Sequence, residues 1–235
     1  MMFWKGVVLV SAVMLLSLIF VSAGIAILVF LIRRPLRKYK YIDLAVFDWL
    51  QTRTSPRRNR FMLFITLLGK HQFLVPANLF LIIYFLFISS YSWFSIRDAA
   101  IALSSLGLML LLKNLFRRKR PLAPLLNAVK GLSFPSGHAI MAVTFYGFII
   151  YILFHTVSND VVKYFLTALL VILIGLVGFS RVYLRVHYLS DVLAGFIIGL
   201  LWLFVSIAVL NRVEDFIKEK NLSIPSVSRA TQATG

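Results

Sequence analysis

The sequence predicts an all-α integral membrane protein, built as one bundle of six transmembrane helices with an interfacial helical segment between the first and second helices. Hydrophobic residues make up 60% of the 235 residues, whereas about half is usual in soluble domains. Only 14% of the residues are charged, which is too little polar surface for a soluble domain of this length. Long apolar runs alternate with short polar connections. This pattern excludes an ordinary soluble globule, a disordered chain and a nucleic-acid-binding domain in water.

The net charge of +17 is carried mainly by the connections between the apolar runs. In a membrane protein, basic residues in such places meet either anionic headgroups or an anionic substrate. We therefore expect membrane lipids as partners and no nucleic acid, and no obligate protein partner is evident. The chain contains no cysteine, which excludes disulfides, thiolate metal sites and cysteine nucleophiles.

The first predicted transmembrane helix covers residues 6–32, a stretch of 27 residues without a charged side chain. At about 1.5 Å per residue it is long enough to cross a hydrocarbon core of about 30 Å. A cleavable signal peptide is the weaker interpretation, because the sequence stays apolar through Ile32, well past the small residues at 21–23.

The segment 41–68 contains two apolar stretches that are too short to cross a membrane. Asp43 and Asp48 flank the apolar residues of the first stretch, which predicts an amphipathic helix at the membrane interface. A polar loop with Pro56 separates the two stretches. The segment is a candidate lid or interfacial collar.

Five further apolar runs complete the predicted bundle, at residues 73–90, 97–116, 136–155, 161–180 and 188–210. Residues 221–235 are polar and rich in small side chains, so we predict a disordered tail after one membrane domain that covers residues 1–220. An even number of crossings puts both termini on one side of the membrane. It also puts the connections between helices one and two, three and four, and five and six together on the opposite side.

Three polar motifs interrupt the apolar sequence, and all of them fall on that opposite side. They are Lys113 with Arg120-Pro121 at the end of the third helix, Pro135-Ser136-Gly137-His138 at the start of the fourth, and Ser180-Arg181 with His187 and Asp191 between the fifth and sixth. The predicted topology therefore brings the three motifs to one face of the membrane.

The motifs offer several groups that suit a phosphate. Lys113, Arg120 and Arg181 supply positive charge, and a planar guanidinium matches the geometry of phosphate oxygens. Ser136 is a favourable N-cap residue for the fourth helix. The free backbone amides at such a helix start attract an anion.

Two histidines offer acid–base and nucleophilic groups. His138 lies in the first turn of the fourth helix, close to any anion bound there. His187 and Asp191 are four residues apart and share a face if that segment is helical. A carboxylate that accepts from one ring nitrogen leaves the other nitrogen free as nucleophile or base. Because Asp191 is the only carboxylate in the motifs, we expect phosphoryl transfer without a metal or other cofactor.

Together, K-x6-R-P, P-S-G-H and S-R-x5-H-x3-D resemble the signature of the type 2 phosphatidic acid phosphatase (PAP2) superfamily. The motifs cover Lys113 to Asp191, and the six-helix layout extends the resemblance over most of the chain. The resemblance implies a metal-independent membrane lipid phosphatase that hydrolyses a phosphomonoester or diphosphate. Undecaprenyl diphosphate, phosphatidylglycerophosphate, phosphatidate and lipid A phosphates are the substrates it suggests.

The resemblance also implies a role for each motif residue. His187 would attack phosphorus and form a phosphohistidine, Asp191 would orient His187, and His138 would protonate the leaving oxygen and then activate water. The phosphoryl oxygens would be held by Lys113, Arg120, Ser136, Gly137 and Arg181. Supporting positions would be Ser180, Pro121 and Pro135.

Other interpretations stay open. A lipid phosphotransferase would use the same site with a second acceptor in place of water, and a vanadate-dependent peroxidase would bind vanadate there. A non-catalytic membrane protein would only bind anionic lipid. Within the first motif, we interpret Arg117, Arg118 and Lys119 as charges that face lipid headgroups.

Charge distribution and resemblance predict opposite orientations. The motif side carries 18 Lys and Arg residues and the other side 7, which by the positive-inside rule places the motifs in the cytoplasm. Most members of the resembled superfamily act at the extracytoplasmic face. We follow the more specific resemblance and expect an extracytoplasmic site in a bacterial plasma membrane.

Overall fold

The computed structural model describes residues 40–89, 91–121 and 131–222. Within these ranges the chain is helical and contains no strand, and it divides into two units, Met1–Trp49 and Leu50–Gly235. The helices are α2 (Lys40–Gln51), α3 (Pro56–Leu67), α4 (His71–Phe87), α5 (Trp93–Phe116), α6 (Gly137–Thr156), α7 (Asp160–Tyr183) and α8 (Leu189–Leu222). The predicted helix at 6–32 and residues 223–235 of the predicted tail lie outside the described residues.

Five segments of the described chain are long and apolar enough to cross a membrane: Pro56–Phe87, Trp93–Phe116, Gly137–Thr156, Asp160–Tyr183 and Leu189–Glu219. Four of them match the third to sixth predicted transmembrane helices. Pro56–Phe87 contains most of the second, predicted at 73–90, but begins earlier and includes the second apolar stretch of the segment predicted to be interfacial. The all-helical membrane architecture is confirmed for this part of the chain. The first crossing was expected at 6–32, so the total of six stays a prediction.

The observed helices differ from the predicted bounds mainly at their ends. α5 begins at Trp93 rather than at 97, and α8 continues to Leu222 rather than ending at 210. Hydropathy gives no signal for this extension of α8 because its sequence is largely polar. Lys218 Nζ lies 2.5 Å from Glu214 Oε1, one turn earlier, and this pair supports the extension as a helix.

The predicted interfacial segment 41–68 forms two helices, α2 and α3. At the start of α3, the Ser55 side chain accepts a hydrogen bond from the Arg58 amide at 3.3 Å. Pro56 fills the first helical position, where its missing amide hydrogen costs nothing. Tyr183 near the end of α7 donates its hydroxyl to Asn59 Oδ1 at 2.8 Å and so joins α3 to α7.

A short break at residues 68–70 separates α3 from α4; together with the last two residues of α3 it is here called the elbow, residues 66–70. The amides of Leu68, Gly69 and Lys70 each donate to the carbonyl three residues earlier, at 3.1, 3.2 and 3.0 Å. These tight turns interrupt the helix, and α4 then starts with Lys70 as its extended N-cap. Tyr146 on α6 donates its hydroxyl to the Leu68 carbonyl at 2.8 Å, which fixes the elbow to the bundle.

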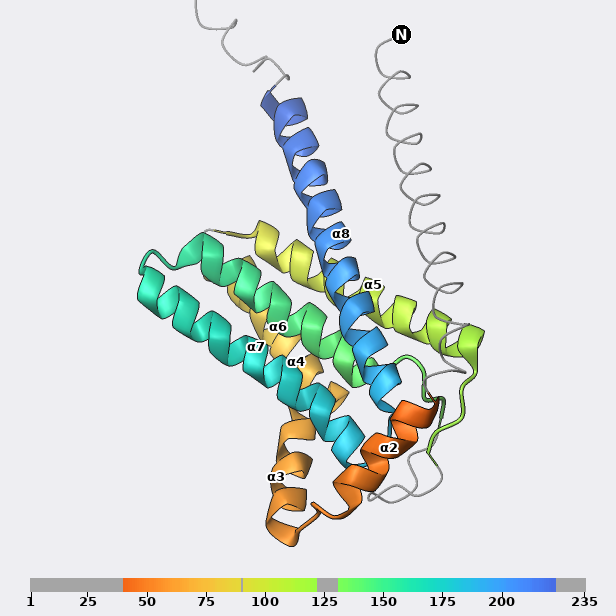
Figure 1. Cartoon of the computed structure of the whole chain (residues 1–235). Coiled ribbons are helices and arrows are strands. Elements are labelled where there is room, and N and C mark those ends of the chain that lie inside the picture. Colours follow the sequence, from red (N-terminus) through yellow and green to blue (C-terminus); the bar gives the residue numbers. More distant parts are fainter. Residues whose placement is uncertain (1–39, 90, 122–130, 223–235) are drawn as a thin grey trace, which may run out of the picture. The chain divides into compact units, whose positions relative to one another are not determined.

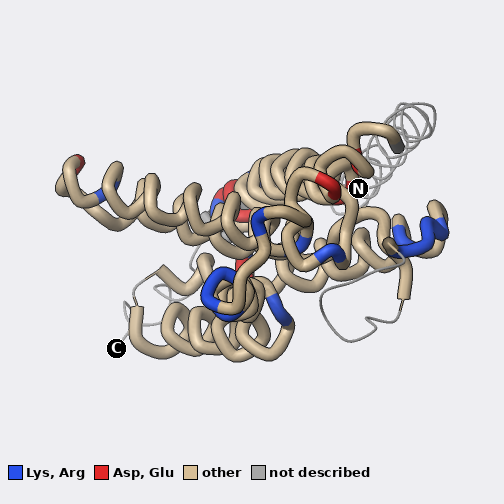
Figure 2. The backbone as a smooth tube through the Cα atoms, turned by 60° about the horizontal axis from the view of Figure 1, so that its bottom comes forward, with Lys and Arg blue, Asp and Glu red and all other residues tan. Residues whose placement is uncertain are grey.

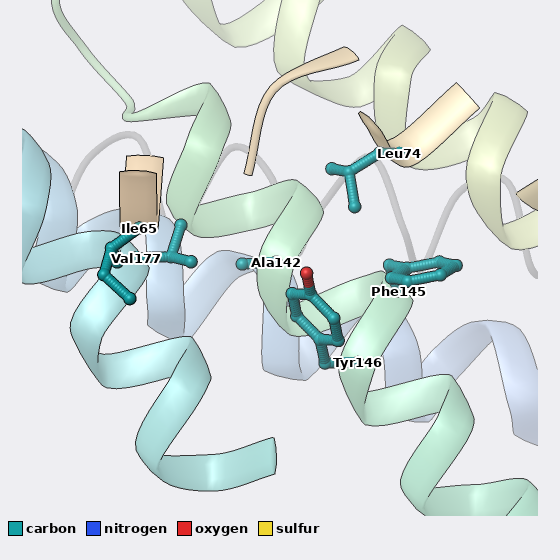
Figure 3. Packing of buried hydrophobic residues seen from close by; sticks show 6 residues of the cluster. All are labelled: Ile65, Leu74, Ala142, Phe145, Tyr146 and Val177. Atoms are coloured by element: carbon teal, nitrogen blue, oxygen red, sulfur yellow. The ribbon is translucent and has the colours of Figure 1, made fainter. Parts of the chain in front are cut away.

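α6 is the central helix and packs against α5, α7 and α8, while α4 packs on α5 and α3 on α7 (Figure 1). Apolar side chains from four helices meet in one buried cluster (Figure 3): Ile65, Leu74, Ala142, Phe145, Tyr146 and Val177. Gly195 and Gly199 let α8 approach α6 closely, because a Cβ on Gly195 would lie 2.9 Å from the Ser136 carbonyl oxygen. This contact sets the register between the starts of α6 and α8.

Charged residues of the described chain gather on connections and helix ends, whereas the long helices are mostly uncharged (Figure 2). Large apolar side chains point outward from these helices; Phe80 is 67% and Leu103 71% exposed. Apolar surface of this kind suits contact with lipid tails. Polar chemistry is therefore confined to the ends of the bundle.

Candidate active site

The three motifs meet at one end of the bundle, where α5 and α7 end and α6 and α8 begin. Backbone hydrogen bonds join the connections there. The Ser133 amide donates to the Arg118 carbonyl at 2.7 Å, and the Ser136 amide donates to the Asp191 carbonyl at 3.1 Å. The predicted convergence of the motifs is thus observed.

His187 lies in the turn between α7 and α8, and its side chain is buried. The amides of Val186 and His187 both donate to the Arg181 carbonyl, at 3.1 and 3.2 Å. Arg185 adopts a φ of 54° where the chain turns back. His187 Nδ1 lies 3.6 Å from Asp191 Oδ2, so the structure brings together the predicted His–Asp pair.

The carboxylate of Asp191 is fully buried and held through both oxygens. Oδ2 accepts hydrogen bonds from the Ser133 hydroxyl and from the Tyr188 amide, the latter at 3.0 Å. Oδ1 accepts from Arg118 Nη1 at 2.6 Å. The same Nη1 donates to Ser190 Oγ at 2.8 Å, and the guanidinium carbon lies 4.1 Å from the centre of the Tyr188 ring.

The interpretation of Arg118 as a headgroup-facing charge is therefore wrong. Arg118 lies in the variable stretch of the first motif, and its partners Ser190 and Asp191 are 72 and 73 residues further along the chain. No local spacing signals a contact over that distance. Only the folded arrangement of the α5–α6 connection reveals it.

Arg120 lies beside the other nitrogen of the His187 ring. Its Nη1 is 3.5 Å from His187 Nε2 and donates to the Val186 carbonyl at 2.9 Å, and its Nε donates to the Gly131 carbonyl at 3.2 Å. Burial lowers the pKa of Arg120 from its ordinary value, and the charge of Asp191 partly offsets this. The two carbonyls hold the guanidinium where an anion facing Nε2 would bind.

The environment of His187 keeps its ring neutral. Burial lowers the pKa of His187 to about 4, although the nearby carboxylate of Asp191 acts in the opposite direction. The charges of Arg120 and Arg181 lower it further. With a carboxylate beside Nδ1, the preferred tautomer carries its proton on Nδ1 and its lone pair on Nε2.

Two further predicted cations, Lys113 and Arg181, lie near Arg120. Arg181 is 3% exposed and donates from Nη1 to Thr66 Oγ1 at 2.5 Å, and its Nε has no hydrogen-bond partner among the described residues. Lys113 is partly buried and donates from Nζ to the Leu132 carbonyl at 2.9 Å. Both charges lie within electrostatic range of Arg120. Such a concentration of positive charge favours an anion.

Ser136, Gly137 and His138 form the start of α6, as predicted. Ser136 occupies the N-cap position, but its buried hydroxyl makes no capping hydrogen bond and has no partner in the described part of the chain. His138 Nε2 is also buried without a partner there. These polar atoms and the free amides of the helix start are groups that can bind an anion.

The predicted supporting residues shape the adjoining backbone. Ser180 is buried, donates its hydroxyl to the Val177 carbonyl at 2.6 Å and accepts from the Leu184 amide at 2.9 Å. Pro135 precedes the N-cap of α6 and follows a cis peptide bond. Pro121 comes directly after Arg120.

Four residues near the site were not predicted from the sequence: Thr66, Lys70, Arg118 and Ser133. Thr66 and Lys70 belong to the elbow, and Lys70 lies within electrostatic range of His138. Thr66 is 115 residues from its partner Arg181, so this contact again depends on tertiary packing. Over the described ranges, no three His, Asp or Glu residues are grouped so as to hold a metal ion.

Comparison with protein families matches residues 98–215 to the PAP2 superfamily. The chain is 36% identical over 167 residues to phosphatidylglycerophosphatase B of Bacillus subtilis (strain 168). The aligned region covers 69% of this chain and 80% of that protein. It is also 32% identical over 88 residues to lipid phosphate phosphatase delta of Arabidopsis thaliana. That aligned region covers 37% of this chain and 21% of that protein.

Two solved structures have a similar fold. The crystal structure of a transmembrane PAP2-type phosphatidylglycerolphosphate phosphatase from Bacillus subtilis has a TM-score of 0.72 at 29% identity, over 80% of this chain and 94% of that chain. The crystal structure of Aquifex aeolicus LpxE has a TM-score of 0.57 at 25% identity, over 70% of this chain and 94% of that chain. Both similarities extend well beyond the three motifs.

Proposed function

This chain belongs to the PAP2 superfamily and is a membrane lipid phosphatase, and from that premise we propose what it hydrolyses and how its site works. The substrate is a phosphomonoester or diphosphate of a lipid. Phosphatidylglycerophosphate is the leading candidate, because a relative of 36% identity is named phosphatidylglycerophosphatase B. Undecaprenyl diphosphate, phosphatidate and lipid A phosphates present the same phosphoryl group.

In the first step, His187 Nε2 attacks phosphorus and forms a nitrogen–phosphorus bond while the bond from phosphorus to the leaving oxygen breaks. Protonated His138 donates its proton to that oxygen. Asp191 faces Nδ1 and stabilises the positive charge that develops on the ring. The lipid product leaves with a hydroxyl or a phosphate in place of the broken ester or anhydride.

In the second step, His138 takes a proton from water, and the water oxygen attacks phosphorus. The nitrogen–phosphorus bond breaks, inorganic phosphate leaves, and His187 returns to its neutral form. Both steps use the same two histidines, and the proposed mechanism requires no metal or other cofactor.

Positive charge around the phosphoryl group stabilises both transition states. We assign this role to Lys113, Arg120 and Arg181, together with the amides of Ser136 and Gly137 at the start of α6. Donors fixed in place by the fold usually provide the largest catalytic contribution. Carbonyl groups hold Lys113 and Arg120, and a buried hydroxyl holds Arg181.

One observation carries the proposal: the buried ring of His187 lies between a carboxylate and a guanidinium. Nδ1 is 3.6 Å from Asp191, and Nε2 is 3.5 Å from Arg120. A histidine buried only for packing needs neither neighbour. This arrangement orients a lone pair toward a group that attracts phosphate.

The test is phosphate release from a panel of lipid phosphates in detergent with EDTA. We expect release by the wild type and a loss of about a thousandfold in His187→Ala. His155→Ala is the matched control, because His155 lies at the other end of α6 and contacts the Tyr151 carbonyl through Nδ1 at 2.8 Å. A folded wild type that releases no phosphate, or that requires a metal, would contradict the proposal.

We also propose the membrane arrangement: six crossings within a domain of residues 1–220, an interfacial segment at 41–68, and no obligate protein partner. The site faces the outside of a bacterial plasma membrane and both termini face the cytoplasm. Membership in the superfamily supports this orientation against the charge count. A reporter fused after Gly235 should be active only in the cytoplasm, and activity only outside would reverse the orientation.

A further inference from the structure

The elbow between α3 and α4 contacts two residues of the proposed active site. Thr66 Oγ1 accepts a hydrogen bond from Arg181 Nη1 at 2.5 Å, and both side chains are buried. Gly69 packs against His138, since a Cβ added to Gly69 would lie 3.1 Å from His138 Cδ2 and 2.5 Å from Val177 Cγ1. The elbow therefore forms one wall of the site, on the side of His138.

Lys70 is the next residue of this wall, and its charge has no structural role among the described residues. Its side chain is partly exposed, and no described residue forms a hydrogen bond or ion pair with the ammonium group. It stands at the N-cap of α4, where the helix dipole disfavours a cation and the first turn offers no acidic residue. The charge lies within electrostatic range of His138.

This inference rests on the proposed function, which gives a cation at position 70 a role. If His138 protonates the leaving oxygen, the leaving group lies against His138 and so against the elbow. We propose that Lys70 binds a second phosphate on the leaving-group side, so that the enzyme favours lipids with two phosphates over lipids with one. A compact ammonium on a flexible stem suits this task.

Two kinds of substrate present such a second phosphate. In phosphatidylglycerophosphate it is the diester that joins the two glycerol units, and in undecaprenyl diphosphate it is the phosphate bonded directly to the one removed. Phosphatidate has none. The three lipids therefore separate recognition of the second phosphate from recognition of the phosphoryl group itself.

The experiment measures kcat/KM of the full-length enzyme on these three lipids for the wild type, Lys70→Met, Lys70→Gln, Lys70→Arg and the control Lys163→Met. Lys163 stands near the start of α7, at the other end of that helix from the site, and pairs with Asp160 at 2.7 Å. The readout is the ratio of kcat/KM for each two-phosphate lipid to kcat/KM for phosphatidate. Gel filtration checks that each variant is folded.

In Lys70→Met and Lys70→Gln we expect the ratio to fall about tenfold for at least one two-phosphate lipid, which is the size of one lost charge-assisted hydrogen bond. Lys70→Arg and Lys163→Met should keep the wild-type ratio. The lipid whose ratio falls shows which spacing between the two phosphates Lys70 recognises. Ratios unchanged in folded Lys70 variants would refute the role of Lys70 alone, whereas a wild type inactive on all three lipids would refute the proposed function as well.

Discussion

The carboxylate of Asp191 has more partners than its task of facing His187 requires. Arg118 holds one oxygen, and the Ser133 hydroxyl and the Tyr188 amide hold the other. A buried carboxylate needs such partners, because burial without them costs several kcal/mol, roughly as for other buried charges. The contacts also fix the direction in which the carboxylate meets the imidazole.

Replacement of Arg118 by alanine should leave Asp191 buried without its cation. We expect a loss of unfolding free energy of about 3 kcal/mol and a fall in kcat of about tenfold or more, because the carboxylate would no longer be held in line with His187. Thermal unfolding and steady-state kinetics in detergent measure both effects. Arg117→Ala is the matched control, since the side chain of Arg117 is exposed and donates to the Asn114 carbonyl three residues earlier. Equal behaviour of the two variants would argue against a positioning role for Arg118.

The pKa of His187 predicts how activity depends on pH. Because the neutral ring is the proposed nucleophile and its pKa is about 4, lowered from 6.5, protonation of His187 should begin to reduce kcat/KM only as the pH approaches 4. The same shift contributes stability above pH 6.5 that is lost as the pH falls toward 4. The pH profile of kcat/KM, corrected for ionisation of the substrate, tests this expectation. An acid limb near pH 6.5 would show that the ring titrates as an exposed histidine does.

At the scale of elements, helix packing determines where the motif residues lie. The start of α8 lies against the start of α6 through Gly195, and the Ser136 amide donates to the Asp191 carbonyl across the same contact. A small residue is needed there because the α6 backbone is so close. The start of α6 and the backbone that carries Asp191 are therefore joined directly.

Gly195→Ala should disturb this contact. The added methyl group would lie 2.8 Å from Ala139 Cβ and 2.9 Å from the Ser136 carbonyl oxygen, so we expect a loss of about 1–3 kcal/mol in stability and a clear fall in kcat. Gly175→Ala is the control, because nothing lies within 4 Å of a Cβ there and alanine favours a helix. Thermal unfolding and activity measurements on both variants test this expectation. A Gly195→Ala enzyme as stable and active as Gly175→Ala would mean that α8 shifts without consequence.

The helices themselves could be predicted because an uncharged apolar run longer than a bilayer is thick has few other interpretations. α5, α6, α7 and α8 all contain the runs expected of them. The polar end of α8 and the elbow could not be located in this way. The end of α8 is held by side-chain pairs such as Lys218 with Glu214, and the elbow is held by a contact with Tyr146. A hydropathy profile detects neither contact.

At the scale of the molecule, the even count of crossings predicted that the motifs share one face, and the structure places them together at one end of the bundle. The residues His138, His187 and Asp191 were predictable because motif spacing encodes them locally. Thr66 and Arg118 were not, since their partners are 115 and 73 residues away. Their roles exist only once the helices pack.

The opposite end of the bundle has its own polar anchor. Arg97 near the start of α5 forms an ion pair with Glu214 on α8 and donates to Asn211 Oδ1 at 2.8 Å. At about 1.5 Å per residue, this anchor lies some 24 Å along α5 from Lys113, on the evidence of helix geometry. Stability at one end and chemistry at the other can therefore change separately.

The proposed site lies at helix ends, beside helices with exposed apolar side chains, so catalysis on a lipid would take place within the plane of the membrane. Substrate arrives by lateral diffusion within the leaflet rather than from bulk solution. The quantity that saturates the enzyme is then the mole fraction of substrate among the surrounding lipids. Adding inert lipid at constant total substrate should slow turnover by surface dilution, and the membrane thereby acts as the solvent whose composition sets the rate.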